Sequence, residues 1–463
     1  MSTREEGAPS LIVRSRDDLV AWLAEGCKPK ESWRVGTEHE KFVFHTGTLT
    51  PVPYEGERSI RALMDALVDR FGWEPIREGD RIIALKRPDG VHGGTISLEP
   101  GGQFELSGAP LRTLHETCRE AGEHFHEILS VGEALRIGFL GLGFSPKWTL
   151  AETPRMPKDR YAIMTRFMPE VGTRGLDMMY RTATIQVNVD FSDEYDMVKK
   201  LRVSLALQPI VTALFASSPF TEGRPNGCKS LRSEIWRDTD RERTGMLPFA
   251  FEPGMGFERY TDYALNVPMY FVYRAGRYID VAGASFKDFL AGRLANLPGE
   301  RPTLDDWSDH LTTLFPEVRL KRFLEMRGAD GGPWQRVCAL PALWVGLLYE
   351  EDALDAAWTL VKDWTAEERE TLRGEVPRAA LATRFRESTV QDIAREVLQI
   401  ARKGLRYRRQ INAAGDDETV HLDVLEEVVE SGKTLADELL ERFEGPWRRN
   451  IDHVFEECAL LSL

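Results

Sequence analysis

The ten residues from Thr182 to Phe191, TATIQVNVDF, alternate strictly between polar and apolar side chains. Such alternation is typical of a β-strand with one face in the core. Its polar face carries Thr, Gln, Asn and Asp but neither Lys nor Glu. Short hydrogen-bonding groups suit the floor of a ligand site, and we favour this interpretation over an ordinary solvated face. The candidate floor residues are Thr184, Gln186 and Asn188.

A second predicted strand, residues 33–44, carries two glutamates on one face. Glu38 and Glu40 are two residues apart, so both side chains project from the same side of the strand. Two like charges in this arrangement repel each other. The repulsion is tolerable on an exposed edge strand, which is the structural alternative. It becomes useful where a divalent cation lies between the carboxylates.

The segment Thr95–Ser107 predicts two more strands, joined by a turn at its Pro-Gly-Gly sequence. Glu99 lies at the start of the turn, and Gln103 and Glu105 share one face of the second strand. This face is either the solvated side of an antiparallel sheet or part of an oxygen-rich cluster. The two acidic strands support each other as a cluster if they lie in one sheet.

Arginines are concentrated in residues 230–243, where four of them, including Arg232, are interspersed with acids. They form either surface ion pairs or a bidentate clamp on a carboxylate or phosphate. The segment Tyr260–Arg274 is rich in aromatic residues, among them Tyr270, and could wall a small pocket.

The segment Leu320–Asp330, LKRFLEMRGAD, predicts the end of a helix at Gly328. Glu325 and Arg327 lie just before that end and are candidates for one more carboxylate and one more guanidinium in a shared site. Further helices are expected for residues 58–71, 111–135 and 195–218.

Charge and motif content exclude several classes of protein. The formal net charge of −14 argues against a dedicated binder of nucleic acid or of anionic membranes. The longest apolar run, residues 339–349, is too short to span a bilayer. IGFLGLGFSP at 137–146 lacks the third glycine of a dinucleotide-binding loop, and the chain has no GxxxxGK[ST] phosphate loop. Any nucleotide must therefore be held in another way.

Compartment and domain organisation are expected from simple features. The first 30 residues carry too many charges for the apolar core of a signal peptide, and the five cysteines are scattered, with no CxxC and no metal-ligand spacing. Both features favour a reducing, cytoplasmic location. From residue 346 the sequence is helical and acidic, so we expect an α+β catalytic core at 1–345 and a helical C-terminal region, 346–463, packed on it.

Six phrases together resemble the plant-type glutamate–cysteine ligases, which occur in plants and many proteobacteria: GTEHEKF, SLEPGGQFELSGAP, LDMMYRTATIQVNVDF, ALFASSPFTEGRPNG, RSEIWRDTDRERTG and HLTTLFPEVRLKRFLEMRGADGGPW. The resemblance runs from about Glu31 to the C-terminus, and we interpret the chain as a proteobacterial member. It implies the α+β fold of carboxylate–amine ligases related to glutamine synthetase, in which helices surround a curved antiparallel sheet.

The implied reaction joins the γ-carboxylate of glutamate to cysteine through γ-glutamyl phosphate, at the expense of ATP and with Mg²⁺ or Mn²⁺. It is the first step of glutathione biosynthesis. A related γ-glutamyl ligase that uses another amine, or serves another thiol pathway, is the alternative. A non-catalytic binding protein is the third possibility. The expected partners are glutamate, cysteine and ATP, with no nucleic acid and no membrane.

The resemblance also implies roles for particular residues. Arg232 corresponds to the clamp on glutamate, Arg327 to the contact with the transferring phosphate, and Tyr270 to the cysteine pocket. Residues 278–300 lack the regulatory cysteine pair of plant members, which predicts a monomer or weak homodimer. The implied metal ligands are Glu38, Glu40, Glu99, Glu105 and Glu325, and the implied cysteine pair, a possible disulfide, is Cys118 and Cys338.

Overall fold

The computed structural model describes residues 10–88 and 94–460. Within these residues nine strands form one sheet in the order β14-β15-β7-β1-β5-β4-β3-β2, with β6 paired to the second half of β1. Every pairing in this sheet is antiparallel, as predicted. The strands are β1 (Val35–His45), β2 (Glu74–Glu78), β3 (Arg81–Lys86), β4 (Thr95–Leu98), β5 (Phe104–Ser107), β6 (Ile137–Leu140), β7 (Thr184–Val189), β14 (Val318–Leu320) and β15 (Leu324–Asp330).

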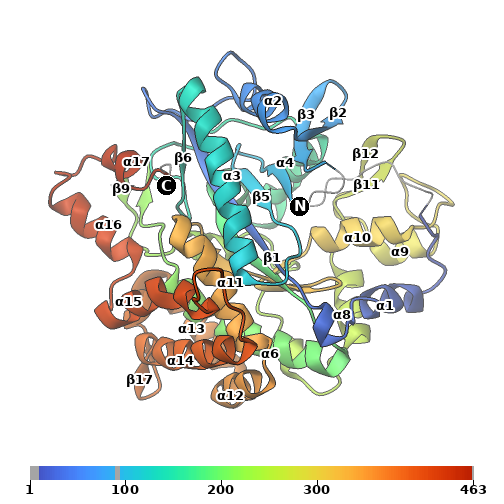
Figure 1. Ribbon diagram of the computed structural model, residues 1–463. Coiled ribbons are helices and arrows are strands. Elements are labelled where there is room, and N and C mark those ends of the chain that lie inside the picture. The colour runs from blue at the N-terminus through green and yellow to red at the C-terminus, as the bar shows by residue number, and fades with distance from the viewer. Residues whose placement is uncertain (1–9, 89–93, 461–463) are drawn as a thin grey trace.

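Strand β1 lies at the centre of this sheet, between β7 and β5, so the interpretation of residues 33–44 as an exposed edge strand is wrong. One face of β1 presents Glu38 and Glu40, and the other buries His39 and Lys41. The Lys41 Nζ lies 3.0 Å from His39 Nδ1 and 2.9 Å from Nε2 of the buried His124. These contacts join the sheet to helix α3 (Leu114–Leu135), which lies in front of β1 in Figure 1; α11 (Trp334–Leu348) also contacts β1.

The segment Leu320–Asp330 corrects one prediction, because it forms a β-hairpin and does not end a helix. Strands β14 and β15 pair with Arg319 opposite Glu325, and β15 also pairs with β7. A shift in register between Met326 and Ala329 interrupts the alternation of the strand. A bulge of this kind hides the period of two on which strand recognition from sequence depends.

Further helices pack against the sheet, among them α6 on β15 and α2 on β3. The three predicted helices are confirmed as α2, α3 and α6, with ends that differ by a few residues. The helices not yet given are α1 (Arg16–Ala24), α2 (Ile60–Phe71), α4 (Asp159–Val171), α5 (Gly175–Arg181), α6 (Glu194–Leu214), α7 (Leu231–Trp236), α8 (Phe257–Asn266), α9 (Phe286–Leu290) and α10 (Leu304–Thr312), with short 3-10 turns η1 (Lys30–Ser32) and η2 (Pro248–Phe251).

The C-terminal region is helical and packs on α6 and α11. The boundary expected at residue 345 lies inside α11, and one hydrophobic cluster contains residues from both sides of it. In Figure 1 the orange and red helices lie against the lower left of the sheet. The elements are α12 (Glu351–Val361), α13 (Ala366–Ala379), η3 (Ala380–Ala382), α14 (Val390–Arg408), η4 (Glu418–Leu422), α15 (Asp423–Ser431), α16 (Leu435–Glu444) and α17 (His453–Glu457).

Four small two-stranded pairings complete the described chain. They are β8 (Phe220–Thr221) with β9 (Arg224–Pro225), β10 (Thr244–Gly245) with β13 (Phe315–Pro316), β11 (Phe271–Arg274) with β12 (Arg277–Asp280), and β16 (Arg384–Phe385) with β17 (Ser388–Thr389). Among the helices of the described ranges, none combines the length and the apolar character that crossing a membrane requires.

Candidate active site

A cavity lies over the face of the sheet opposite α3, and its floor comes from neighbouring strands. Glu38 on β1 lies opposite Gln186 on β7, and Glu40 on β1 lies opposite Glu105 on β5. Glu99 follows β4 at the turn into β5. Carboxylates from β1, from β5 and from the turn between β4 and β5 thus converge, because these strands are adjacent. The sequence predicted this convergence on the condition that the strands share one sheet.

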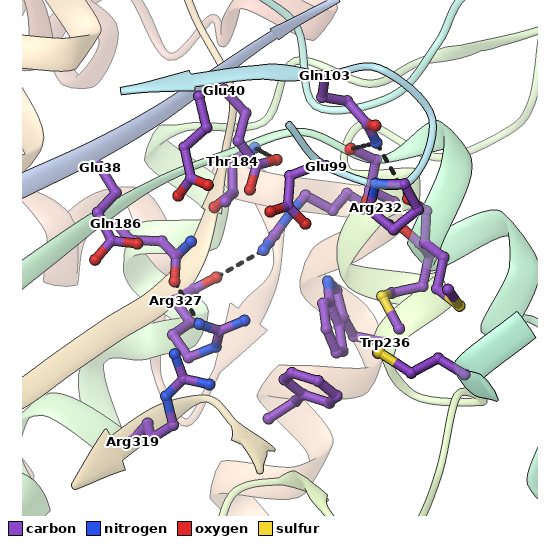
Figure 2. Close-up of a pocket in the computed structure, with 17 residues that line it drawn as sticks. Glu38, Glu40, Glu99, Gln103, Thr184, Gln186, Arg232, Trp236, Arg319 and Arg327 are labelled. Carbon is purple, nitrogen blue, oxygen red and sulfur yellow. Dashed lines mark hydrogen bonds between the residues drawn. The ribbon is translucent and has the colours of Figure 1, made fainter. Parts of the chain in front are cut away.

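Arginines and apolar side chains form the rest of the cavity wall. Figure 2 shows Arg232, Arg319 and Arg327 around the space into which Glu38 and Glu40 point. Cations therefore face a group of anions across one small cavity. The apolar lining residues are Met164, Met178, Met179, Trp236 and Phe315, and Pro100, Gln103, Thr182 and Thr184 complete the lining.

The carboxylates are held by few hydrogen bonds. Glu38 accepts one from Asn188 Nδ2 at 2.9 Å, and Glu40 accepts one from the backbone N–H of Thr184 at 3.1 Å. The Ser97 hydroxyl donates to Glu105 at 2.6 Å. The buried Oε1 of Glu99 has no hydrogen-bond partner among the described residues. A buried carboxylate oxygen without a hydrogen-bond partner is suited to bind a cation.

Burial and mutual repulsion alter the acidity of these groups. Burial, with the charges of Glu99 and Glu105, raises the pKa of Glu40 well above its ordinary value. Burial and the Glu105 charge raise the pKa of Glu99 to about 7. These buried carboxylates repel one another when they are ionised. A divalent cation would offset that repulsion, so the residues present fit such an ion.

Glu325 does not line the cavity, although the family resemblance implied that it binds metal. It is fully buried beneath the arginines, 2.6 Å from Arg319 and 2.9 Å from Lys321, and it also pairs with Arg327. Burial alone would raise the pKa of Glu325, but Arg319, Lys321 and Arg327 together lower it well below its ordinary value. In this arrangement Glu325 positions guanidinium groups.

The two predicted catalytic arginines are adjacent. Arg232 donates from Nη2 to the backbone carbonyl of Arg327 at 2.8 Å, and Arg327 donates to Gln186 Oε1 at 2.5 Å (Figure 2). A guanidinium fixed on one side keeps its remaining donors directed into the cavity.

Residues that sequence reasoning missed support these arginines. Asp330, at the end of β15, accepts hydrogen bonds from the hydroxyls of Ser218 at 2.6 Å and Ser230 at 2.7 Å. Ser230 caps helix α7, which carries Arg232. Arg319 was missed because the β14–β15 hairpin was interpreted as a helix; strand pairing would have placed it opposite Glu325.

Tyr270 and the predicted cysteine pair lie outside the cavity. Tyr270 is buried, with the Arg243 guanidinium 3.8 Å from its ring centroid, and it does not line the cavity. Cys118 and Cys338 lie on α3 and α11, away from the cavity lining. Both are free thiols, and their sulfurs lie within 4.8 Å of each other, as expected of a pair that is close in space.

Comparisons with known proteins identify the family of this chain. The family model described as Glutamate-cysteine ligase family 2 (GCS2) matches residues 34–457. A chloroplastic glutamate–cysteine ligase of Nicotiana tabacum is 58% identical over 443 residues, covering 96% of this chain and 82% of that protein. One from Arabidopsis thaliana is 56% identical over 453 residues, covering 98% of this chain and 84% of that protein.

The relatives also correct one prediction from the sequence. Those from Nicotiana tabacum, Oryza sativa and Brassica juncea are all named chloroplastic, which contradicts the expected cytoplasmic location.

A solved structure, a glutamate–cysteine ligase of Francisella tularensis in complex with AMP, shares the fold with a TM-score of 0.52 at 11% identity. The match covers 89% of this chain and 85% of the Francisella tularensis chain. The predicted α+β fold with a curved antiparallel sheet is thereby confirmed.

Proposed function

The chain belongs to glutamate–cysteine ligase family 2, and from that premise we propose that the cavity described above is its active site. The protein is an ATP-dependent ligase that joins the γ-carboxylate of L-glutamate to the amino group of L-cysteine. The product, γ-glutamylcysteine, serves glutathione biosynthesis. The observation that carries the assignment of the site is the convergence of four carboxylates and three guanidinium groups on one cavity.

Two chemical steps are required. The γ-carboxylate of glutamate forms a bond to the γ-phosphorus of ATP as the bond to the ADP oxygen breaks. The neutral amine of cysteine then attacks the acyl carbon of γ-glutamyl phosphate, and inorganic phosphate leaves. Phosphoryl transfer depends on positioning and on neutralisation of charge more than on a protein nucleophile.

We assign the acidic side of the cavity to magnesium, with manganese as a substitute. Glu38, Glu40, Glu99 and Glu105 would hold the ions, which neutralise phosphate oxygens when they are bound. Support comes from the unpartnered oxygen of Glu99 and from the raised pKa of Glu40. Gln186, Thr184 and Asn188 then serve the floor by orienting Arg327, Glu40 and Glu38 respectively.

The basic side is assigned to the anionic substrates. Arg232 binds a carboxylate of glutamate, and Arg327 contacts the phosphoryl group during its transfer. Each guanidinium has further N–H donors beside the acidic cluster that can make these contacts. Arg319 adds a third positive charge to this wall.

The apolar wall favours cysteine over other amines as the acceptor. Met164, Met178 and Met179 contribute polarizable thioethers, and Trp236 and Phe315 contribute rings. Such a surface suits a small sulfur-containing side chain better than a charged or fully polar one. A sister ligase that uses another amine would keep the acids and arginines and differ here.

The test is release of ADP with Mg-ATP and L-glutamate in the presence of L-cysteine, L-2-aminobutyrate, glycine or ammonia, with product masses. Turnover that strongly favours cysteine supports the proposal. Preference for another amine would reassign the acceptor while leaving the metal site in place. Absence of turnover with every amine would favour a non-catalytic protein.

Several expectations stay predictions. They are the division of the chain near residue 345, a monomer or weak homodimer, and a bridge between Cys118 and Cys338 under oxidation. The interpretation of the chain as a proteobacterial member also stays a prediction, because the relatives named above are plant proteins. Light scattering during size-exclusion chromatography would test the oligomeric state.

A further inference from the structure

A cluster of two cysteines and a histidine lies at the junction of α3, α11 and the C-terminal turn η4. Cys118 and Cys338 are both more than nine-tenths buried, and His421 is half-buried beside them. Their donor atoms all lie within 4.8 Å of one another. Across residues 10–88 and 94–460, no other three Cys, His, Asp or Glu side chains bring donor atoms this close.

The spacing of these atoms is close to that of a tetrahedral metal site. The Cys118 Sγ lies 3.6 Å from His421 Nδ1. Zinc bonds of about 2.3 Å to sulfur and about 2.0 Å to nitrogen, at a tetrahedral angle, place the two atoms roughly 3.5 Å apart. Two sulfurs bound to one zinc ion would be roughly 3.8 Å apart. The sulfurs of Cys118 and Cys338 lie within 4.8 Å of each other, so they exceed that separation by at most about 1 Å, which small side-chain rotations can close.

The ring of His421 is oriented by a second histidine. Its Nε2 lies 3.2 Å from Nδ1 of His115, which precedes Cys118 by one turn of α3. When the proton of His421 is on Nε2, it is donated to His115, and the unprotonated Nδ1 faces the sulfurs. Metal-binding histidines characteristically engage their other ring nitrogen in this way.

An open cleft gives ions access to the cluster. It has a volume of ≈ 430 Å³, and Cys118, Cys338 and His421 line it together with Asp423 and Glu427. Glu427 is exposed at the mouth and favours the approach of cations, while the exposed Asp423 pairs with Arg402 at 2.8 Å. Three protein donors also leave the fourth tetrahedral position to a water molecule from this cleft.

We propose that Cys118, Cys338 and His421 of the reduced protein bind a soft divalent cation of the zinc class. Thiolate and imidazole donors select such ions over Mg²⁺, so this site and the carboxylate site take different metals. Binding displaces the thiol protons and ties the α3 and α11 helices to η4 in the C-terminal region. The sequence indicated no metal site because the three donors are more than 80 residues apart along the chain.

The experiment titrates Co²⁺, then Zn²⁺, into the fully reduced, metal-stripped full-length chain in the presence of excess Mg²⁺. A thiol count beforehand verifies that no disulfide has formed. We expect one equivalent of Co²⁺ with a thiolate-to-cobalt charge-transfer band, and displacement of that band by Zn²⁺. Binding at the carboxylates alone, with no thiolate band, would overturn the proposal.

Variants identify the ligands. Cys118→Ser and Cys338→Ser should each abolish the band that Co²⁺ gives, and His115→Gln should weaken binding about 10- to 100-fold through loss of the support to His421. Cys458→Ser, which replaces a buried thiol elsewhere, should leave binding unchanged. A band that persists in Cys118→Ser would refute the assignment.

A measurement on the unaltered chain covers the case in which a variant fails to fold. Zn²⁺ should protect Cys118 and Cys338, but not Cys27 or Cys228, from alkylation, as read by peptide mass. Equal modification of all four with and without Zn²⁺ would contradict the site.

Discussion

Glu40 on β1 lies directly opposite Glu105 on β5, and both carboxylates line the same cavity. Like charges in this cross-strand position destabilise a sheet. This pair nevertheless lies at the centre of the sheet, and Glu38 and Glu99 add to the repulsion. On the proposed function, divalent cations and a polyphosphate in the cavity would offset this repulsion.

Replacement of Glu40 by glutamine should therefore separate stability from activity. In metal-free buffer Glu40→Gln should raise the free energy of unfolding by up to about 1 kcal/mol, because the opposed pair is removed. The amide oxygen can still accept the hydrogen bond from Thr184. The kcat should fall by at least about 100-fold as several kcal/mol of metal-dependent stabilisation is lost.

Urea unfolding with a chelator and steady-state ADP release measure the two quantities. Glu74→Gln is the control, because Glu74 lies on the outer strand β2 and pairs with Lys86 at 3.5 Å. It should change neither. Near-normal turnover by Glu40→Gln would remove this residue from the metal site.

The pH dependence of stability should reveal Glu99. Its pKa is raised from the ordinary 4.5 to about 7, mainly by burial. Between these values the unfolded chain has released a proton that the folded protein still holds, so rising pH favours unfolding. The contribution of neutral Glu99 is complete below about pH 4.5 and is lost as the pH passes about 7.

Glu99→Gln cannot titrate, so it should gain stability relative to the native chain as the pH rises from 5 to 8. The gain should be roughly 1–3 kcal/mol without metal. Excess Mg²⁺ should cancel it, because the ion stabilises the ionised carboxylate. Unfolding curves at several pH values, with and without Mg²⁺, provide the measurement; a difference that does not vary with pH would contradict the burial of a protonated Glu99.

Lysine substitutions should distinguish the two arginines. Arg327 contacts Gln186 and Glu325, and a lysine ammonium lacks the planar fork needed to hold both and still reach the phosphate. Arg327→Lys should lower kcat with little change in KM. Arg232→Lys should instead raise KM for glutamate. Each effect should be about 10- to 150-fold, the loss of one charged hydrogen bond worth 1.5–3 kcal/mol.

The control for these variants is Arg237→Lys, since Arg237 lies at the end of the same helix α7 but pairs with Glu234 at 2.9 Å. It should retain both kinetic constants. If Arg232→Lys changed kcat alone, the assignment of Arg232 to glutamate binding would fail.

Regular alternation explains what could be predicted from the sequence. The spacing of two residues predicted that Glu38 and Glu40 share one face of a strand and that Glu105 shares a face with Gln103. Their meeting in one cavity depended on the two strands lying in one sheet, which the pairing of β1 with β5 shows. The hairpin of β14 and β15 could not be predicted, because its bulge breaks the period of two. The ion pairs of Glu325 depend on that hairpin, so they could not be predicted either.

Contacts between distant segments explain the other features that could not be predicted. The aromatic-rich segment Tyr260–Arg274 predicted a pocket wall. In the structure the ring of Tyr270 packs against Phe167 and Arg243 in the core. No local pattern distinguishes a buried aromatic residue from one that lines a cavity. The same limitation applies to Cys118 and His421, which only tertiary packing brings together.

Gly143 makes a long-range contact of this kind with Asp330. A Cβ at this position would lie 2.3 Å from Cγ of Asp330, far closer than atoms can approach. Asp330 accepts the hydrogen bonds of Ser218 and Ser230, and Ser230 caps the helix that carries Arg232. The glycine therefore allows the buried carboxylate to organise helix α7, which carries Arg232, and it serves no dinucleotide loop.

Gly143→Ala should force Asp330 out of its network and so act on Arg232 at a distance. We expect a loss of about 2–4 kcal/mol in the free energy of unfolding, typical of a disrupted buried network, together with a higher KM for glutamate. Gly47→Ala, where an added Cβ meets nothing within 4 Å, should change neither. If Gly143→Ala kept its stability and its KM, Asp330 could not be holding α7 in place, and Arg232 would depend on its contact with the Arg327 carbonyl alone.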